Sequence, residues 1–285
     1  MNNFKFFKPQ SFKELLDIKD ELLSAGYPLA GGSNLLVYIK ENMVKSGTLI
    51  DISSIEELKG INKVDGSIEI GAAETITNIL ESSLINRELP FFSLSLKDFG
   101  NPLIRNKATI GGNLADASPV ADTAPPLLVL GAFVSVVSRS GTRKIPVAEL
   151  FTGPRKNKLE ENEVIQKIII PIPLEGKGAF LKLGQRKGTS ISVTSVAVWI
   201  ESSSDKFRNI KIALGGVAPT PVRALNTEKA FSGKNIDRNS IKTFAETLRK
   251  DIRPISDVRG SAEYRTEVSI NLLKRAVYEC LEMEE

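Results

Sequence analysis

Two Gly-Gly strings constrain the fold of this 285-residue chain more than any other feature of its sequence. The first is AGGSNLL, residues 30–36, and the second is TIGGN, residues 109–113. Paired glycines remove two Cβ atoms where a backbone must turn sharply or be approached closely, and neighbouring hydroxyl and amide side chains can hydrogen-bond that backbone. Each string alone is also compatible with an ordinary turn. The pair together predicts one extended ligand that is held from two sides.

A carboxylate follows the second string at a short distance along the chain. Asp122 ends the segment DASPVAD, residues 116–122, which is dense in small residues and short hydrogen-bond acceptors. Such a carboxylate can accept hydrogen bonds from the hydroxyls of a nucleotide ribose or from an amine. The string and this segment together have the composition of a site for an anion or a cofactor.

The bulk composition is that of a soluble globular protein, with 41% apolar and 25% charged residues. Its length predicts two or three compact domains, or one large domain with a lobe. No run approaches the roughly twenty apolar residues of a membrane span, and the first residues lack the long apolar core of a signal peptide. We therefore expect a cytoplasmic protein without a membrane span.

The residues available for chemistry are few. The lone Cys280 cannot close an intrachain disulfide, and by itself it cannot hold an iron–sulfur cluster or a structural zinc. The absence of histidine excludes the usual catalytic triads and histidine bases. We therefore expect no metal site and no catalytic side chain, and a chemistry that is borrowed from a cofactor.

The net charge of +4 and the pI near 9.0 do not point to nucleic acid. The basic residues are scattered, and no alternation of basic and aromatic residues is present. A phosphate-bearing small ligand or an acidic partner protein accounts for the charge equally well.

The hydrophobic patterns predict an α+β chain. Ser11 and Glu14 form a capping box before an amphipathic helix, Asp65-Gly66 turns a hairpin, and Thr75 caps a helix that runs to Leu84. The apolar run 35–40 predicts a buried strand or helix turn, and a further helix is expected at 91–99. Other strands are expected at 27–30, 48–52, 133–137 and 163–170.

The proline- and glycine-rich stretch 171–178 is the one credible linker. Beyond it, strands at 179–187, 192–201 and 207–215 predict an antiparallel sheet that helices at 241–250 and 263–281 cover on one face. This pattern gives provisional domains at residues 1–54, 55–173 and 174–285. Trp199 lies in an apolar strand and is expected in the core.

The usual dinucleotide fingerprints, Gly-x-Gly-x-x-Gly after a strand and the phosphate loop, are absent. Instead, the chain closely resembles the FAD-binding subunit of the molybdenum hydroxylases, the family of xanthine dehydrogenase and of the medium subunit of aerobic carbon monoxide dehydrogenase. The resemblance covers essentially the whole chain. It rests on the strings AGGSNLL (30–36), IGA (70–72), IRNKATIGGNLADASPVAD (104–122), GPRKNKLEENEVIQKIIIP (153–171) and LGGVAPTPVRA (214–224).

The resemblance implies a two-lobed FAD-binding domain of the vanillyl-alcohol-oxidase type, followed by a C-terminal antiparallel sheet with helices. The first string would form one wall of the FAD site and the second string the other, with Asp122 at the nucleotide part and Phe99, Ile165 and Lys182 near the flavin ring. The FAD-binding residues implied are Leu29, Ala30, Gly31, Gly32, Ser33, Asn34, Leu36, Phe99, Gly100, Thr109, Gly112, Asn113, Asp116, Asp122, Ile165 and Lys182. On the residues alone, Lys182 is equally a solvated strand lysine, Phe99 is equally a core residue, and Ile165 is better explained as core.

The function that the resemblance implies is electron relay. A molybdopterin site on one partner subunit oxidises the substrate, [2Fe-2S] clusters on another partner carry single electrons, and FAD on this chain collects them for an external acceptor. Some relatives carry a cysteine-ligated cluster in this subunit, which Cys280 alone cannot hold. With no histidine and no suitably placed cysteine, the FAD is expected to be noncovalent. The acceptor can be NAD, a quinone or oxygen, and the substrate is set by another chain.

Two alternatives from other classes stay open at the level of the sequence. One is a scaffold subunit that keeps the fold but has lost the flavin, against which the intact glycine strings and Asp122 argue. The other is a self-contained flavin oxidase, although such enzymes usually carry histidine or tyrosine near the flavin and this chain has no histidine.

Overall fold

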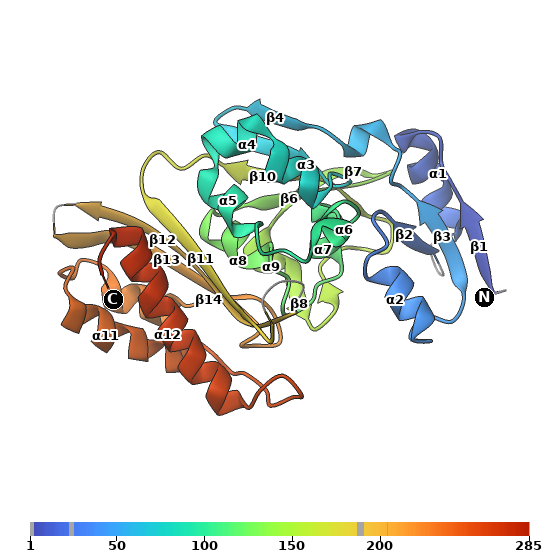
Figure 1. The fold of residues 1–285 in the computed structure, drawn as a ribbon. Coiled ribbons are helices and arrows are strands. Elements are labelled where there is room, and N and C mark those ends of the chain that lie inside the picture. Colours follow the sequence, from blue (N-terminus) through green and yellow to red (C-terminus); the bar gives the residue numbers. More distant parts are fainter. Residues whose placement is uncertain (1–2, 23–25, 187–190, 204, 285) are drawn as a thin grey trace.

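A computed structural model describes residues 3–22, 26–186, 191–203 and 205–284. The parts of the molecule follow one another in space in the order of the sequence (Figure 1). A small N-terminal lobe lies at one end, a sheet with many short helices fills the middle, and a second sheet with one long helix and several short ones forms the other end. The predicted α+β class is confirmed.

The N-terminal lobe is built on a parallel three-stranded sheet in the order β1-β3-β2. Ser11 begins the helix as predicted, since its hydroxyl accepts a hydrogen bond from the Glu14 amide at 3.2 Å. The Glu14 carboxylate accepts from the amide of Gln10 rather than from that of Ser11. In chain order the elements are β1 (Phe4–Phe7), α1 (Phe12–Leu22), β2 (Gly26–Leu29), α2 (Leu35–Lys40), β3 (Gly47–Asp51) and a 3-10 helix (Glu56–Leu58).

The middle of the chain forms an antiparallel five-stranded sheet in the order β4-β5-β10-β6-β7. The predicted hairpin is present, and Asp65 and Gly66 both have positive φ, as its turn requires. The strands are β4 (Ile61–Val64), β5 (Ser67–Gly71), β6 (Phe133–Ser138), β7 (Gly141–Pro146), β8 (Phe151–Gly153), β9 (Lys156–Asn157) and β10 (Val164–Pro171). The helices are α3 (Ile76–Glu81), α4 (Ser83–Glu88), α5 (Pro90–Ser95), α6 (Pro102–Arg105), α7 (Ile110–Ala115), α8 (Ala124–Val129) and α9 (Val147–Leu150).

Three predicted elements differ in detail from the structure. The helix capped by Thr75 stops before Ser82, because Ser82 has an extended backbone and caps α4. The helix expected at 91–99 is the shorter α5. The run 35–40 is a helix without a buried residue, so the expected burial is wrong. The reason is that the core of the lobe is built around α1 and β3, and α2 lies outside it.

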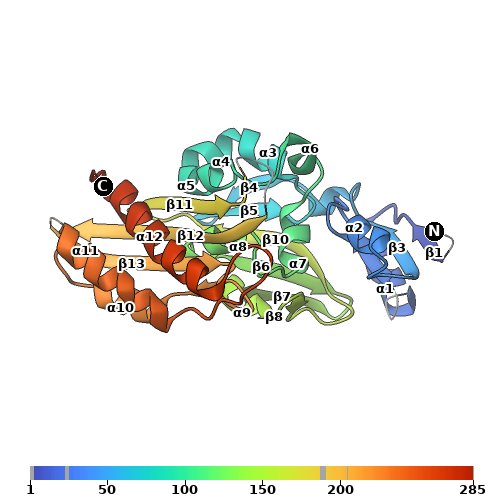
Figure 2. The ribbon, with the colours of Figure 1, turned by 60° about the horizontal axis from the view of Figure 1, so that its bottom comes forward.

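The C-terminal part is an antiparallel four-stranded sheet in the order β11-β12-β13-β14, with α12 lying across it (Figure 2). Its elements are β11 (Lys177–Gly184), β12 (Ser192–Ser203), β13 (Lys206–Gly215), β14 (Val222–Arg223), α10 (Leu225–Phe231), α11 (Arg238–Ala245), a 3-10 helix (Glu246–Lys250) and α12 (Ala262–Leu281). The three predicted strands and two predicted helices are present, although Lys187, the expected end of the first strand, falls outside the described residues.

Both faces of β12 are buried, which explains its nearly continuous apolar sequence. Val196 and Val198 point to the core under α10, α11 and α12. Ala197 and Trp199 point the other way, into the core shared with α5 and α8 of the middle sheet. Trp199 is buried as predicted, and its ring lies 5.7 Å from that of Phe91. The sheet is therefore held between helices of two different parts of the chain.

The provisional domain boundaries stay predictions. The middle sheet ends with β10 at Pro171, and the C-terminal sheet begins with β11 at Lys177. No helix in the described part of the chain is long and apolar enough to cross a membrane.

Candidate functional site

The first glycine string touches the backbone just before the second. The first follows β2 directly, at the carboxyl end of a parallel strand, and there Gly31 packs against the backbone that precedes the second string. A Cβ at Gly31 would overlap the carbonyl oxygen of Lys107, so only glycine allows this approach. The next residue, Gly32, has a φ of +69°, which also favours glycine. The first string is thus shaped both by its own turn and by its contact with the second.

The second string is fixed to the segment that follows β5. The amide of Ile110 donates to the Glu74 carbonyl at 3.1 Å, and that of Gly111 donates to the Ala72 carbonyl at 3.0 Å. Thr109 caps α7, since its hydroxyl accepts from the Gly112 amide at 3.1 Å. The hydroxyl next to the glycines therefore does hydrogen-bond their backbone, as the sequence predicts.

Asp116 joins the two strings through side chains. Its carboxylate accepts hydrogen bonds from the Asn34 amide at 2.8 Å and from the Tyr38 hydroxyl at 2.9 Å. Burial, and after it the hydrogen bond to Asp116, raise the pKa of Tyr38 to about 12. Asn34 ends the turn of the first string and Tyr38 lies on α2, so this carboxylate ties the N-terminal lobe to the end of α7.

A cleft of about 680 Å³ lies where the strings meet. Phe99 and Ile165 line it while being only 8% and 4% exposed, so these two residues belong both to the core and to the cleft wall. The predicted FAD residues that line it are Leu29, Ala30, Gly31, Gly32, Ser33, Asn34, Phe99, Thr109, Gly112, Asn113, Asp116 and Ile165.

Four predicted residues, Leu36, Gly100, Asp122 and Lys182, do not line the cleft, and their roles stay predictions. Lys182 of β11 forms an ion pair with Asp122 at 2.6 Å and donates to the Asp98 carbonyl at 3.1 Å. Asp122 also accepts from the Ser192 hydroxyl at 2.5 Å. The paired side chains are 12% and 6% exposed, for Asp122 and Lys182 respectively. They therefore fasten the C-terminal sheet to the segment behind the second string.

The sequence analysis assigned no role to three other residues that line the cleft. Tyr38 makes the contact with Asp116, and Asn157 donates from its side chain to the Ala115 carbonyl at 2.8 Å. The guanidinium of Arg155 lies 4.4 Å above the centre of the Tyr38 ring. Arg155 and Asn157 lie in GPRKN, residues 153–157, which begins one of the strings that carry the family resemblance. That resemblance was the one signal in the sequence that pointed to these two residues.

The cleft fits a dinucleotide such as FAD. A Cβ at Gly112 would meet only the Thr109 hydroxyl within 4 Å, so beyond that hydroxyl the backbone of the string faces open space. Most of the lining is apolar or small, and about a third of it is polar or charged, which suits a ligand with both an apolar ring and a polar nucleotide part. Cys280 is buried in the C-terminal core, where burial raises the pKa of its thiol to about 12, and it does not line the cleft.

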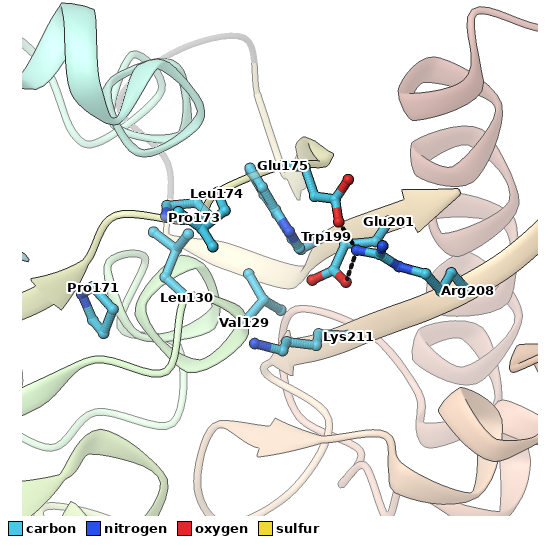
Figure 3. A pocket seen from close by; sticks show the side chains of 10 residues that line it. All are labelled: Val129, Leu130, Pro171, Pro173, Leu174, Glu175, Trp199, Glu201, Arg208 and Lys211. Carbon is cyan, nitrogen blue, oxygen red and sulfur yellow. Dashed lines mark hydrogen bonds and ion pairs between the residues drawn. The ribbon is translucent and has the colours of Figure 1, made fainter. Parts of the chain in front are cut away.

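A second, smaller hollow of about 240 Å³ lies where the linker after β10 passes Trp199 (Figure 3). Arg208 at its edge forms ion pairs with Glu175 and Glu201, so that its guanidinium is already neutralised. None of the predicted FAD residues lines this hollow. The larger cleft is therefore the candidate site.

Comparison with known proteins gives two family matches along the chain. Residues 2–173 match the model described as "FAD binding domain in molybdopterin dehydrogenase", and residues 179–280 match "CO dehydrogenase flavoprotein C-terminal domain". The sequence is 31% identical to the carbon monoxide dehydrogenase medium chain of Hydrogenophaga pseudoflava, over 96% of each chain. It is also 31% identical to the xanthine dehydrogenase FAD-binding subunit of Escherichia coli O157:H7, over 89% of this chain and 88% of that one.

Solved structures match the fold over nearly the whole chain. A carbon monoxide dehydrogenase from Hydrogenophaga pseudoflava that lacks the Mo-pyranopterin moiety superposes with a TM-score of 0.95 at 30% identity, over 98% of each chain. Quinoline 2-oxidoreductase from Pseudomonas putida 86 superposes with a TM-score of 0.93 at 25% identity, over 98% of this chain and 97% of that one.

The adjacent glycines of the second string are expected to respond differently to substitution. A Cβ at Gly111 would lie 2.6 Å from the Ala72 Cβ and 2.7 Å from its carbonyl oxygen. A Cβ at Gly112 would lie 2.8 Å from the Thr109 hydroxyl, and the weaker α7 cap that this causes is offset by the higher helix propensity of alanine. Gly111→Ala should lower the free energy of unfolding by about 1–3 kcal/mol. Gly112→Ala should change it by less than about 1 kcal/mol. Urea unfolding of both variants tests this, and equal losses would contradict the packing described for Gly111.

The phenol of Tyr38 is expected to lose its proton only at a pH above the usual range for tyrosine. Its pKa is raised to about 12 in the folded chain, against an ordinary value of about 10. Its contribution to the free energy of unfolding is therefore fully present below about pH 10 and is lost as the pH rises through about 12. The difference in phenolate absorbance between the wild-type chain and Tyr38→Phe should have its midpoint near pH 12, and a midpoint near 10 would contradict the contact with Asp116.

Proposed function

The chain belongs to the family of FAD-binding subunits of molybdopterin dehydrogenases, and from this premise we propose that it relays electrons through one noncovalently bound FAD. The electrons come from iron–sulfur clusters on one partner subunit, which receive them from a molybdopterin site on another. They leave to an external acceptor, for which NAD, a quinone and oxygen are the candidates.

The observation that carries this proposal is the single cleft formed by both glycine strings. Gly31 allows the strings to meet, Asp116 ties them together, and Gly112 leaves the backbone of the second string open to a ligand. The sixteen FAD-binding residues inferred from the sequence are retained in the proposal, and Tyr38, Arg155 and Asn157 are added to them.

The part played by this chain is to hold and orient the flavin. FAD, when bound, supplies a centre that exchanges electrons singly or in pairs, whereas NAD accepts only a hydride. Backbone amides of the first string would hold its diphosphate, because the amides of Ile110 to Asn113 in the second string already donate within the protein. The buried walls at Phe99 and Ile165 would exclude water from the ring.

The partner subunits are proposed to dock beside the cleft. The two helices α2 and α6 each supply lining residues, and each also exposes large apolar side chains. Leu36 and Val37 on α2 are 51% and 50% exposed, and Leu103 on α6 is 78% exposed. Large exposed apolar side chains on helices that border a site are compatible with a protein interface. A cytoplasmic location suits such a complex and is inferred from the sequence alone.

The proposal predicts the composition of the native complex. Purified from its own host, the chain should elute with molybdenum, iron and flavin together, because it has no means of activating a substrate itself. Acid precipitation of that eluate should leave FAD in the supernatant, because neither histidine nor an accessible cysteine is present to bind it covalently. Metal analysis and chromatography of the released flavin measure both results.

Each part of this prediction has its own contradicting result. Flavin that stays on the precipitated polypeptide would show covalent attachment. Recovery of FMN alone would show that the site binds no diphosphate, because FMN carries a single phosphate. A chain that carries FAD without partners and oxidises a small substrate at full rate would establish a self-contained oxidase instead.

A further inference from the structure

We propose that Arg155 is the residue that neutralises the diphosphate of the bound flavin nucleotide. This inference rests on the proposed function, since it concerns the same cleft. It assigns a binding role to a side chain that comes from neither glycine string.

The charges around the cleft carry the first step. Four of the described lining residues are carboxylates, namely Asp116, Glu160, Glu161 and Glu163, and Arg155 is the one lysine or arginine among them. A diphosphate is doubly negative, and bringing it toward carboxylates is unfavourable unless a cation lies nearby. Backbone amides supply hydrogen bonds but no net charge. Among the described lining residues, the compensating charge has to come from Arg155.

The backbone of Arg155 is fixed close to the second string. The residue lies in the turn between β8 and β9, with a φ of +57°, and its amide donates to the Ala117 carbonyl at 2.9 Å. Ala117 follows Asp116, the residue that joins the two strings. A left-handed conformation is costly for arginine, and it persists here because the hairpin and this hydrogen bond hold it.

The side chain of Arg155 reaches toward the first string. Its guanidinium stacks on the ring of Tyr38, which lies on α2, the helix that begins within that string, and its Nη1 lies 3.8 Å from the sulfur of Met43. The side chain therefore extends from the hairpin to the helix that follows the first string. Arg155 and both strings line the same cleft, so an anion bound between the strings would lie near this guanidinium.

The guanidinium keeps its hydrogen-bonding capacity for a ligand. In the described part of the chain no carboxylate forms an ion pair with Arg155, whereas Glu163 of the cleft wall is paired with Arg143. The ring of Tyr38 holds the guanidinium through its face, and apart from the weak donation of Nη1 to the Met43 sulfur this leaves the N–H groups at its edge available. A planar fork of donors matches two phosphate oxygens at once, which an ammonium group does not.

The test is the affinity of the full-length apoprotein for FAD and for riboflavin, measured by flavin fluorescence. Arg155→Gln should weaken FAD binding about ten- to hundredfold, the loss typical of a hydrogen bond to a charged group. Riboflavin, which has no phosphate, should bind Arg155→Gln and the wild type within about twofold of each other. Arg155→Lys keeps the charge but not the fork and should give an intermediate loss.

Lys156→Gln is the matched control, because Lys156 is the next residue in the same hairpin, is exposed and does not line the cleft. It should bind FAD as the wild type does. Equal FAD affinity of Arg155→Gln and the wild type would overturn the proposal while leaving the flavin function intact. An equal loss for riboflavin would also overturn it, since it would show a structural role. If the wild-type chain binds no flavin, the proposed function itself is wrong.

Discussion

The contact between Gly31 and the carbonyl of Lys107 is the constraint on which the candidate site depends. It brings a turn at the end of a parallel strand against the backbone that leads into α7, at a distance that no side chain permits. From that contact follow the joint lining of the cleft and the position of Asp116 within reach of Asn34 and Tyr38. A small lobe with a modest core is thereby held to a larger body at the place where the ligand is proposed to lie.

The middle and C-terminal sheets hold the second string and the segment after it in place. The middle sheet anchors the second string through the backbone at Ala72 and Glu74. The C-terminal sheet packs against α5 and α8 through one face of β12, and the ion pair of Asp122 with Lys182 joins that sheet to the segment after the second string. Breaking such a buried pair by removing one partner leaves an uncompensated charge, so it would also disturb the position of the C-terminal sheet.

Much of this was predictable from local patterns in the sequence. The paired glycines, the Thr109 cap, the Asp65-Gly66 turn and the apolar run of β12 each have a short-range cause, and each was interpreted correctly from the residues involved. That the two distant strings share one ligand was inferred from their composition and is implied by the family resemblance, and it stays a prediction. The family itself is confirmed by matches along both parts of the chain.

The features that were missed depend on contacts between segments far apart in the sequence. The apolar residues of α2 predicted burial, yet the helix is exposed because the core of its lobe forms elsewhere. Tyr38 and Arg155 acquire a role only when α2, the end of α7 and the β8–β9 hairpin meet. Likewise, neither Asp122 nor Lys182 reveals in its own sequence neighbourhood that the other is its partner.

Hydrogen exchange of the backbone amides, compared with and without FAD, tests the central claim most directly, namely that both strings hold one ligand. If they do, FAD should slow exchange in residues 30–36 and in residues 109–113 together, because a ligand held by both strings suppresses the local opening through which their amides exchange. The amides of β12 lie in the interior of a sheet that does not line the cleft, and they should keep their rates. Protection of only one string, or of neither, with FAD demonstrably bound would contradict the account and place the flavin elsewhere on the molecule.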